Sequence, residues 1–173
     1  MRLGIPGEEH LATSTDFLEL HELPKRIALA GGGFIAAEFS HVAKRAGASV
    51  VVLEVADRML MPFDPDLVDW LMARSREVGI DVRLNTKVEA VEKRGAAFSV
   101  HASSSGQQQT IETDLVVHAA GRVPDLEPLN LSAAHVESEG GRLSLNKYLQ
   151  STSNPAVYAA GDAAMKGPPF AQT

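Results

Sequence analysis

The first part of the chain alternates short apolar runs with amphipathic stretches. Residues 26–30 form an apolar run that predicts a strand, and residues 34–46 repeat apolar positions at helical spacing until Gly47, a common helix stop. Residues 48–55, "ASVVVLEV", are apolar without alternation, which is typical of a strand buried on both faces of a parallel sheet. The predicted order is therefore strand, helix, strand.

A second amphipathic helix is predicted after Asp64. Asp64 is a typical N-cap, Pro65 suits the first helical position, and Gly79 follows the expected end. The buried stripe of this helix is expected to contain Leu67, Val68, Leu71, Met72 and Val78. Trp70 is also expected to pack rather than to serve as a ligand platform. Residues 81–85, "DVRLN", predict a third strand, which completes a mononucleotide-binding half of a doubly wound fold.

The pattern changes in the next segment, where polar and apolar residues alternate. Residues 87–94, 96–102 and 108–113 predict a three-stranded antiparallel meander, and residues 114–121 return to a buried strand that ends in small side chains. The expected fold class is therefore α/β, a Rossmann-like parallel sheet with helices and a three-stranded antiparallel β-meander.

The two ends of the chain are expected to lie outside this fold. Residues 1–24 are interpreted as a connector and residues 25–121 as a dinucleotide-binding domain, and residues 122–173 loosen into a linker and short strands. Within the last segment, residues 141–152 predict a short strand pair and residues 156–162 one more buried strand. We expect that last strand to pair with the N-terminal connector.

Composition narrows the possible functions. A net charge of −6 over 173 residues argues against a broad nucleic-acid-binding surface. No apolar run approaches the ~20 residues of a membrane helix, and the N-terminus lacks the apolar stretch of a secretory signal. The chain has no cysteine, which removes disulfides and thiolate redox or metal centres from it, and its 6 histidines lack metal-ligand spacing. A cytoplasmic location is expected.

The three glycines after the first strand carry the main functional signal. Gly31, Gly33 and Ala36 fit the pattern GxGxxG/A, in which the first glycine permits a tight turn and the second lets a pyrophosphate approach the backbone. The third small residue lets the helix pack close to the strand. Free N–H groups and the positive end of the helix dipole then face the phosphates. A glycine cluster that only forms a turn is the competing interpretation.

An acidic residue at the end of the second strand strengthens the nucleotide interpretation. Glu54 lies where a carboxylate accepts hydrogen bonds from both hydroxyls of an adenosine ribose, although it also suits a solvated strand end. A 2′-phosphate would be repelled by Glu54, and Arg58 is the nearby arginine that would receive it, because positions 55 and 61 hold valine and methionine. The sequence therefore favours NADH over NADPH.

Four motifs in this order resemble the pyridine nucleotide-disulfide oxidoreductases, the family of glutathione reductase, dihydrolipoamide dehydrogenase and mercuric reductase. They are "LPKRIALAGGGFIAAEFS", "VVVLEVADRMLMPFDPDL", "VVHAAGRVPDL" and "VYAAGDAA". The resemblance implies an NAD(P)H domain inserted into an FAD domain, with hydride passing from nicotinamide to flavin in the complete enzyme. The FAD glycine motif, the CxxxxC pair and the C-terminal His-Glu region of the family do not occur in this chain. The chain alone is therefore expected to be inactive, and to be a monomer or a weak dimer.

The resemblance also implies roles for individual residues. Phe34 matches an aromatic residue that covers the flavin, and Glu38 matches a glutamate that places the nicotinamide and pairs with a lysine of the FAD domain. Gly121 would lie near the nicotinamide, and Asp162 matches an FAD contact. Ala36 is common in NADP-dependent members, which conflicts with Glu54; we give Glu54 more weight because charge repulsion outweighs one methyl group. The expected cofactor contacts are Gly31, Gly32, Gly33, Phe34, Ile35, Ala36, Glu38, Glu54, Arg58, Ala120, Gly121 and Asp162.

Two other functions remain open from the sequence. A methyltransferase that uses S-adenosylmethionine also combines a glycine turn with an acidic second strand, but it does not account for the "AAGR" and "AAGD" motifs. A domain with a vestigial nucleotide site that serves only for interaction is the second alternative. No catalytic residue and no metal ligand is expected in the chain itself.

Overall fold

A computed structural model of the chain describes residues 2–164. The chain divides into two compact units, Met1–Gly121 and Arg122–Thr173, which are described separately. The first unit contains two sheets and three α-helices, and the second contains short elements only.

The first unit is centred on a parallel sheet of four strands. These are β1 (Arg26–Ala30), β2 (Ser49–Leu53), β3 (Asp81–Arg83) and β7 (Leu115–His118). Their order is β3-β2-β1-β7, and every neighbouring pair is parallel. Because β2 and β3 lie on one side of β1 and β7 lies on the other, the order in which strands are added to the sheet changes side at β1. This change of side is the switch point at which doubly wound folds bind ligands.

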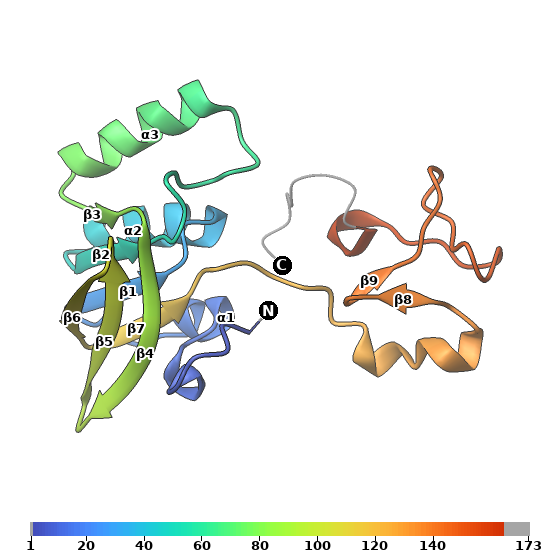
Figure 1. Ribbon diagram of the computed structural model, residues 1–173, viewed down its shortest axis with the longest axis horizontal. Helices are drawn as coiled ribbons and strands as arrows, with labels where there is room; N and C mark the ends of the chain where they lie inside the picture. Colours follow the sequence, from blue (N-terminus) through green and yellow to red (C-terminus); the bar gives the residue numbers. More distant parts are fainter. Residues whose placement is uncertain (1, 165–173) are drawn as a thin grey trace. The chain divides into compact units, whose positions relative to one another are not determined.

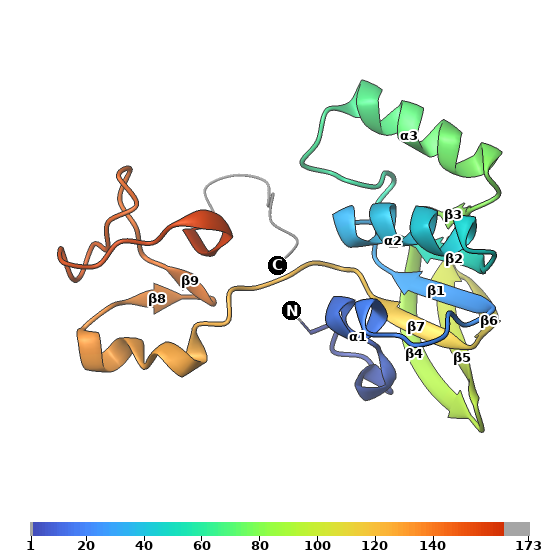
Figure 2. The same ribbon diagram turned by 180° about the vertical axis from the view of Figure 1, so that it is seen from behind.

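Two helices cover one face of this sheet (Figures 1 and 2). Helix α2 (Phe34–Arg45) follows β1, and helix α3 (Pro65–Glu77) precedes β3. The strand side chains Ile27 and Leu29 point to this face and join Phe39 of α2 in one buried cluster. Because side chains alternate in direction along a strand, every second side chain of β1 faces the helices.

Helix α3 differs from its prediction on one face. Asp64 caps it as expected, since Oδ1 of Asp64 accepts hydrogen bonds from the N–H groups of Asp66 and Leu67. Val68 and Met72 are buried, but Leu67 is 62% exposed and Trp70 is 75% exposed. The predictions that Leu67 belongs to the buried stripe and that Trp70 packs are therefore wrong. The helical spacing of apolar residues predicted a buried stripe that is wider than the face of α3 that packs against the sheet.

The three-stranded antiparallel meander predicted from the sequence is formed, and it covers the other face of the parallel sheet. It consists of β4 (Thr86–Arg94), β5 (Ala97–Ser104) and β6 (Gln107–Thr113) in the order β4-β5-β6. A second buried cluster joins the two sheets, with Ala28 and Val116 on one side and Val100 on the other. The parallel sheet is thus buried on both faces, which explains the uninterrupted apolar run in β2.

The N-terminal residues pack onto the first unit. They form a 3-10 turn, η1 (Glu8–His10), and a short helix, α1 (Ser14–Leu18), which begins with a capping box between Thr13 and Asp16. Ala12 forms a parallel bridge with Val117. Phe17 of α1 stacks on Phe39 of α2, with ring centroids 4.3 Å apart. The segment expected to be a connector therefore contributes to the core of this unit.

An ion pair joins the starts of β1 and β7. Oδ2 of Asp114 accepts a hydrogen bond from the Arg26 N–H at 3.0 Å, and Oδ1 accepts one from Nε of Arg26 at 3.1 Å. These hydrogen bonds from Arg26 lower the pKa of Asp114 below its ordinary value. The pair aligns β1, which leads into the glycine turn, with β7, which leads to Gly121.

The second unit contains the 3-10 turns η2 (Glu127–Leu129), η3 (Leu131–Ala134) and η4 (Gly161–Ala164), and a hairpin of β8 (Ser138–Glu139) and β9 (Arg142–Leu143). The strand pair expected within residues 141–152 is found only in part, because β9 pairs with β8 and residue 145 forms just one bridge with residue 151.

The last buried strand of the prediction, residues 156–162, is not formed. Tyr158 makes an isolated bridge with Gln150 and is 63% exposed, and the N–H of Ala159 donates to the carbonyl of Leu149. The expected pairing of this segment with the N-terminal connector stays a prediction. A turn around Asn154, whose N–H donates to Oγ of Ser151, folds the segment back onto its own unit.

Among the described residues, no helix combines the length and apolar character needed to cross a membrane. No group of His, Asp or Glu side chains in that part of the chain is arranged to hold a metal ion.

Candidate functional site

The glycine turn lies where β1 ends and α2 begins. The N–H of Gly31 donates to the carbonyl of Leu53, the last residue of β2, at 2.8 Å. Gly31 has φ +110°, and a Cβ built on it would lie 2.4 Å from both Cα and N of Ala120. Only glycine permits the backbone after β1 to pass this close to the backbone after β7. Gly31 and Ala120, 89 positions apart by their numbers, therefore meet at the switch point of the sheet.

Glu54 closes the other side of the turn. Its Oε2 accepts a hydrogen bond from the N–H of Gly32, and its Oε1 accepts one from the N–H of Ala56 at 2.7 Å. A Cβ on Gly32 would lie 2.7 Å from Oε2 and 2.9 Å from Cγ of Glu54. The half-buried carboxylate is thus held against the glycine turn by two backbone donors. Its position at the carboxyl end of β2 is the one expected from the sequence.

Helix α2 opens directly from this turn. Gly33 is its N-cap residue, with φ −78° and ψ −172°, and it has no side chain to bond the first N–H groups of the helix. The first turn holds Phe34, Ile35 and Ala36, none of which is acidic. The unpaired N–H groups of a helix start and the positive end of its dipole attract an anion. The helix therefore presents donors where a diphosphate would bind.

The side chains of the first helical turns divide by exposure. Ile35 and Ala36 are buried against the sheet, and Ala36 is fully buried, as close packing of helix and strand requires. Phe34 is half-buried and packs against the same cluster. Glu38 is exposed. The structure therefore brings these residues to the same end of α2 and leaves the glutamate in solvent.

The β2–α3 loop, residues 54–64, forms the outer wall of the site. The N–H of Leu60 donates to the carbonyl of Gly32 at 2.9 Å, so the glycine turn is bonded to this loop as well as to Glu54. Arg58 does not extend to Glu54. Its Nη1 donates to the carbonyl of Phe63 at 3.1 Å and its Nη2 to the carbonyl of Met61 at 3.0 Å. The guanidinium of Arg58 therefore connects two backbone carbonyls of its own loop through hydrogen bonds.

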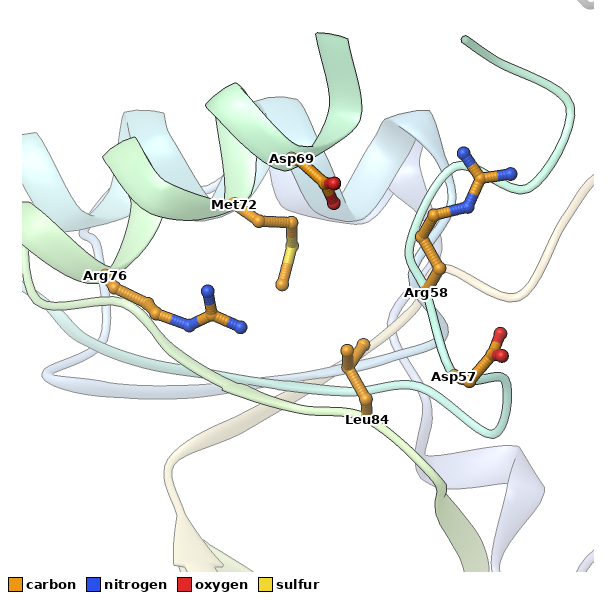
Figure 3. Close-up of a pocket in the computed structure, with 6 residues that line it drawn as sticks. All are labelled: Asp57, Arg58, Asp69, Met72, Arg76 and Leu84. Atoms are coloured by element: carbon orange, nitrogen blue, oxygen red, sulfur yellow. The ribbon is translucent and has the colours of Figure 1, made fainter. Parts of the chain in front are cut away.

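A cavity of about 320 Å³ lies between this loop and α3 (Figure 3). Asp57 and Arg58 of the loop line it together with Asp69, Met72 and Arg76 of α3 and Leu84 after β3. In the close-up, the Arg58 guanidinium points away from Arg76. Two acidic residues and two arginines thus line the same cavity.

The remaining expected cofactor contacts, Ala120, Gly121 and Asp162, are divided between the two units. Ala120 and Gly121 follow β7; the N–H of the preceding Ala119 donates to the carbonyl of Ala30, and Gly121 has φ +117°. Asp162 lies in η4 of the second unit with its side chain exposed. The first unit therefore gathers the glycines, the helix start, Glu54 and the segment after β7.

Two structural contributors were missed in the sequence. Leu60 reaches the glycine turn through its backbone N–H, and Ala56 holds Glu54 through its own N–H. Backbone donors leave no signature in the residue type at their position. The φ of +51° at Leu60 is also uncommon for a leucine and has no signal in the sequence.

Comparison with known proteins places these features in context. A family model described as pyridine nucleotide-disulphide oxidoreductase matches residues 1–173. A mercuric reductase of Staphylococcus aureus is 38% identical over 169 residues, which covers 96% of this chain and 30% of that protein. A glutathione reductase of Burkholderia cepacia is 35% identical over 159 residues, covering 91% of this chain and 34% of that protein.

Among solved structures, a Cu(II) complex of RclA, an HOCl-induced flavoprotein disulfide reductase of Escherichia coli, superimposes with a TM-score of 0.84 at 29% identity. The match covers 98% of this chain and 38% of RclA. LpdA of Mycobacterium tuberculosis superimposes with a TM-score of 0.78 at 26% identity, over 94% of this chain and 35% of LpdA. The chain thus spans well under half the length of the proteins that it matches.

Proposed function

Because the chain belongs to the pyridine nucleotide-disulphide oxidoreductase family, we propose that its first unit binds the nicotinamide dinucleotide of an FAD-dependent oxidoreductase. One observation carries this proposal: the start of α2, which has no side-chain cap, and the Glu54 carboxylate meet at the same glycine turn. The N–H groups there suit the pyrophosphate, and the carboxylate suits the hydroxyls of the adenosine ribose.

The residues present fit a dinucleotide better than a plain turn. A Cβ at Gly31 would meet Ala120 and one at Gly32 would meet Glu54, so glycine at these positions lets the turn pack against the segment after β7 and the carboxylate at the end of β2. This packing holds the uncapped start of α2 beside Glu54, where its N–H groups would bind a diphosphate. A turn that served only to reverse the chain would not require a fixed carboxylate beside it.

NADH is the proposed dinucleotide. A 2′-phosphate on the adenosine ribose would bring negative charge against Glu54, which two backbone N–H groups hold in place. Arg58, the arginine nearest in sequence, donates to two carbonyls of its own loop. Val55 and Met61, 65% and 54% exposed, supply no positive charge. A phosphate dianion would therefore lack a partner there.

The wider roles follow from family membership and are also proposals. Bound NADH would supply the hydride that reduces the flavin of the complete enzyme. Phe34 and Glu38, at the start of α2, would border the nicotinamide half of the dinucleotide. Ala120 and Gly121, which follow β7, would border it as well. Asp162 would contact FAD, which the domains outside this chain would hold. Without those domains the chain would bind NADH and catalyse no reaction.

Calorimetric titration of the chain with NADH, NADPH and S-adenosylmethionine tests the proposal. We expect saturable binding of NADH, weaker binding of NADPH and no heat with S-adenosylmethionine. The variant Glu54→Gln should weaken NADH binding, while Asp57→Asn, an exposed acidic residue three positions on, should not. Binding of S-adenosylmethionine alone would favour a methyltransferase, and binding of none of the three would favour an interaction domain.

A further inference from the structure

The geometry of the β2–α3 loop points to a role for Arg58 other than contact with the nucleotide. We propose that Arg58 is a positioning residue: it holds this loop in the conformation that keeps Leu60 on the carbonyl of Gly32, and so fixes the shape of the glycine turn. This inference rests on the proposed function, since the turn that Arg58 would stabilise is the proposed diphosphate site.

Gly32 is held from both sides by residues of the loop. Its N–H donates to Glu54 at the beginning of the loop, and its carbonyl accepts the N–H of Leu60 farther along. Both bonds depend on the path of the chain between residues 54 and 60. A change in that path would rotate the peptide groups of the glycine turn and shift the start of α2, whose N–H groups are the proposed donors to the diphosphate.

The loop needs external support to follow this path. Leu60 has φ +51°, in the left-handed region that is unfavourable for a residue with a branched side chain. The N–H of Phe63 donates to the carbonyl of Leu60 at 2.8 Å, which closes a tight turn at this point. A strained turn persists only where surrounding interactions determine it.

Arg58 supplies such an interaction. Its Nη2 bonds the carbonyl of Met61, directly after Leu60, and its Nη1 bonds the carbonyl of Phe63 at the end of the same turn. The planar fork of a guanidinium bonds two carbonyls at once with little loss of freedom, which a lysine ammonium cannot match. Arg58 thereby bridges the turn that presents the Leu60 N–H.

The surroundings of Arg58 also argue against its acting as a phosphate receptor. Asp57 and Asp69 line the same cavity, and their carboxylates would repel a phosphate dianion. Arg76 provides a matched control, because it lines this cavity too, is exposed, and makes no side-chain hydrogen bond or ion pair within residues 2–164. The two arginines thus share a cavity and differ in their bonds to the loop.

Titrations of NADH and NADPH into the wild-type chain, Arg58→Gln, Arg58→Lys and Arg76→Gln test the inference. At a temperature well below the melting transition, Arg58→Gln should raise the Kd for both dinucleotides by the same factor, about 3- to 30-fold for the loss of two hydrogen bonds. Arg58→Lys should recover part of the loss, and Arg76→Gln should match the wild type. Hydrogen exchange at the Leu60 amide should rise in Arg58→Gln and stay at the wild-type rate in Arg76→Gln.

The possible failures are distinguishable. A loss confined to NADPH in Arg58→Gln would make Arg58 a phosphate contact and overturn the inference. A lowered melting temperature with both Kd values unchanged would reduce Arg58 to a structural residue, again against it. If the wild type binds neither dinucleotide, the proposed function fails and this inference fails with it; if the wild type binds and Arg58→Gln binds equally well, only the inference fails.

Discussion

The N–H of Gly32 donates a hydrogen bond to Oε2 of Glu54, and the same carboxylate side chain fills the space where a Cβ on Gly32 would lie. The end of β2 and the turn after β1 therefore constrain each other. Glycine at position 32 admits the carboxylate, and the carboxylate in turn orients the peptide N–H of the glycine. The site proposed for the ribose and the site proposed for the diphosphate are in this way one structural unit.

Gly32→Ala should break this unit. The new Cβ would lie 2.7 Å from Oε2 and 2.9 Å from Cγ of Glu54, so the glutamate must move. We expect the free energy of unfolding to fall by about 1–3 kcal/mol, the usual cost of overpacking, and NADH affinity to fall at least about tenfold with the displaced carboxylate. Urea denaturation and calorimetry measure the two effects.

The double variant Gly32→Ala/Glu54→Asp separates this clash from a general loss of stability. Aspartate is one methylene shorter than glutamate, so its carboxylate no longer reaches the position of Oε2 beside the new Cβ, and the double variant should be more stable than the sum of the two single changes predicts. Strict additivity of the two changes would contradict direct contact between the residues.

Gly31→Ala should be much more damaging than the same change at an open turn. At Gly31 the left-handed φ and a Cβ 2.4 Å from the Ala120 backbone act together, which predicts a cost of about 2–5 kcal/mol in the free energy of unfolding. Gly106, with φ +78° and no atom within 4 Å of a built Cβ, is the control and should lose only about 1–2 kcal/mol. Equal losses in urea denaturation would mean that β1 and β7 do not approach so closely.

Much of this arrangement follows from local patterns. The start of α2 at Phe34, the buried run of β2 and the cap at Asp64 each depend on neighbours in sequence, and the structure confirms all three. The alternation that predicted the antiparallel meander is likewise local, because side chains point to opposite faces of a strand at every second position.

The features that were missed depend on distant partners. Leu67 has the spacing of a buried position, but whether a helix face is covered depends on the elements that pack against it, and here Leu67 is exposed. Residues 156–162 have the composition of a buried strand, yet a strand forms only beside other strands. The bond from Leu60 to Gly32 joins two backbone groups and thus has no sequence signature.

Positive charge at positions 55 and 61 should shift the preference toward NADPH. Val55 and Met61 are both exposed in the β2–α3 loop, so we expect arginines there to be tolerated and free to bond a 2′-phosphate. The double variant Val55→Arg/Met61→Arg should move the ratio of the two Kd values toward NADPH by about tenfold or more. Leu67→Arg adds a charge at an equally exposed position of α3 and should leave the ratio unchanged. An equal shift in Leu67→Arg would indicate only a general attraction for anions.

The one tryptophan of the chain reports on the outer face of α3. Trp70 is 75% exposed, so its fluorescence emission should resemble that of tryptophan in water, and acrylamide should quench it almost as well as in the unfolded chain. Trp70→Ser should change the free energy of unfolding by no more than about 0.5 kcal/mol. Blue-shifted emission that depends on protein concentration would instead indicate that a second copy covers this face.

Stability should decline in mildly acidic solution because of His41. Nε2 of this half-buried histidine lies 3.0 Å from Oγ of Ser75, which donates its own proton to the carbonyl of Leu71, so His41 is the donor in the contact between α2 and α3. Burial, and then the positive charges of Arg45 and Arg74, lower the pKa of His41 below its ordinary value of 6.5.

The sign of the pH effect follows from this shift. The unfolded chain takes up the proton at a higher pH than the folded chain, so the free energy of unfolding falls as the pH is lowered through 6.5 toward the folded pKa. His41→Gln keeps a donor for Ser75 without a titrating group, and urea midpoints between about pH 8 and pH 5 should then vary less than in the wild type. His21→Gln, at an exposed position, is the control and should keep the wild-type slope. An unchanged slope in His41→Gln would assign the acid sensitivity to other groups.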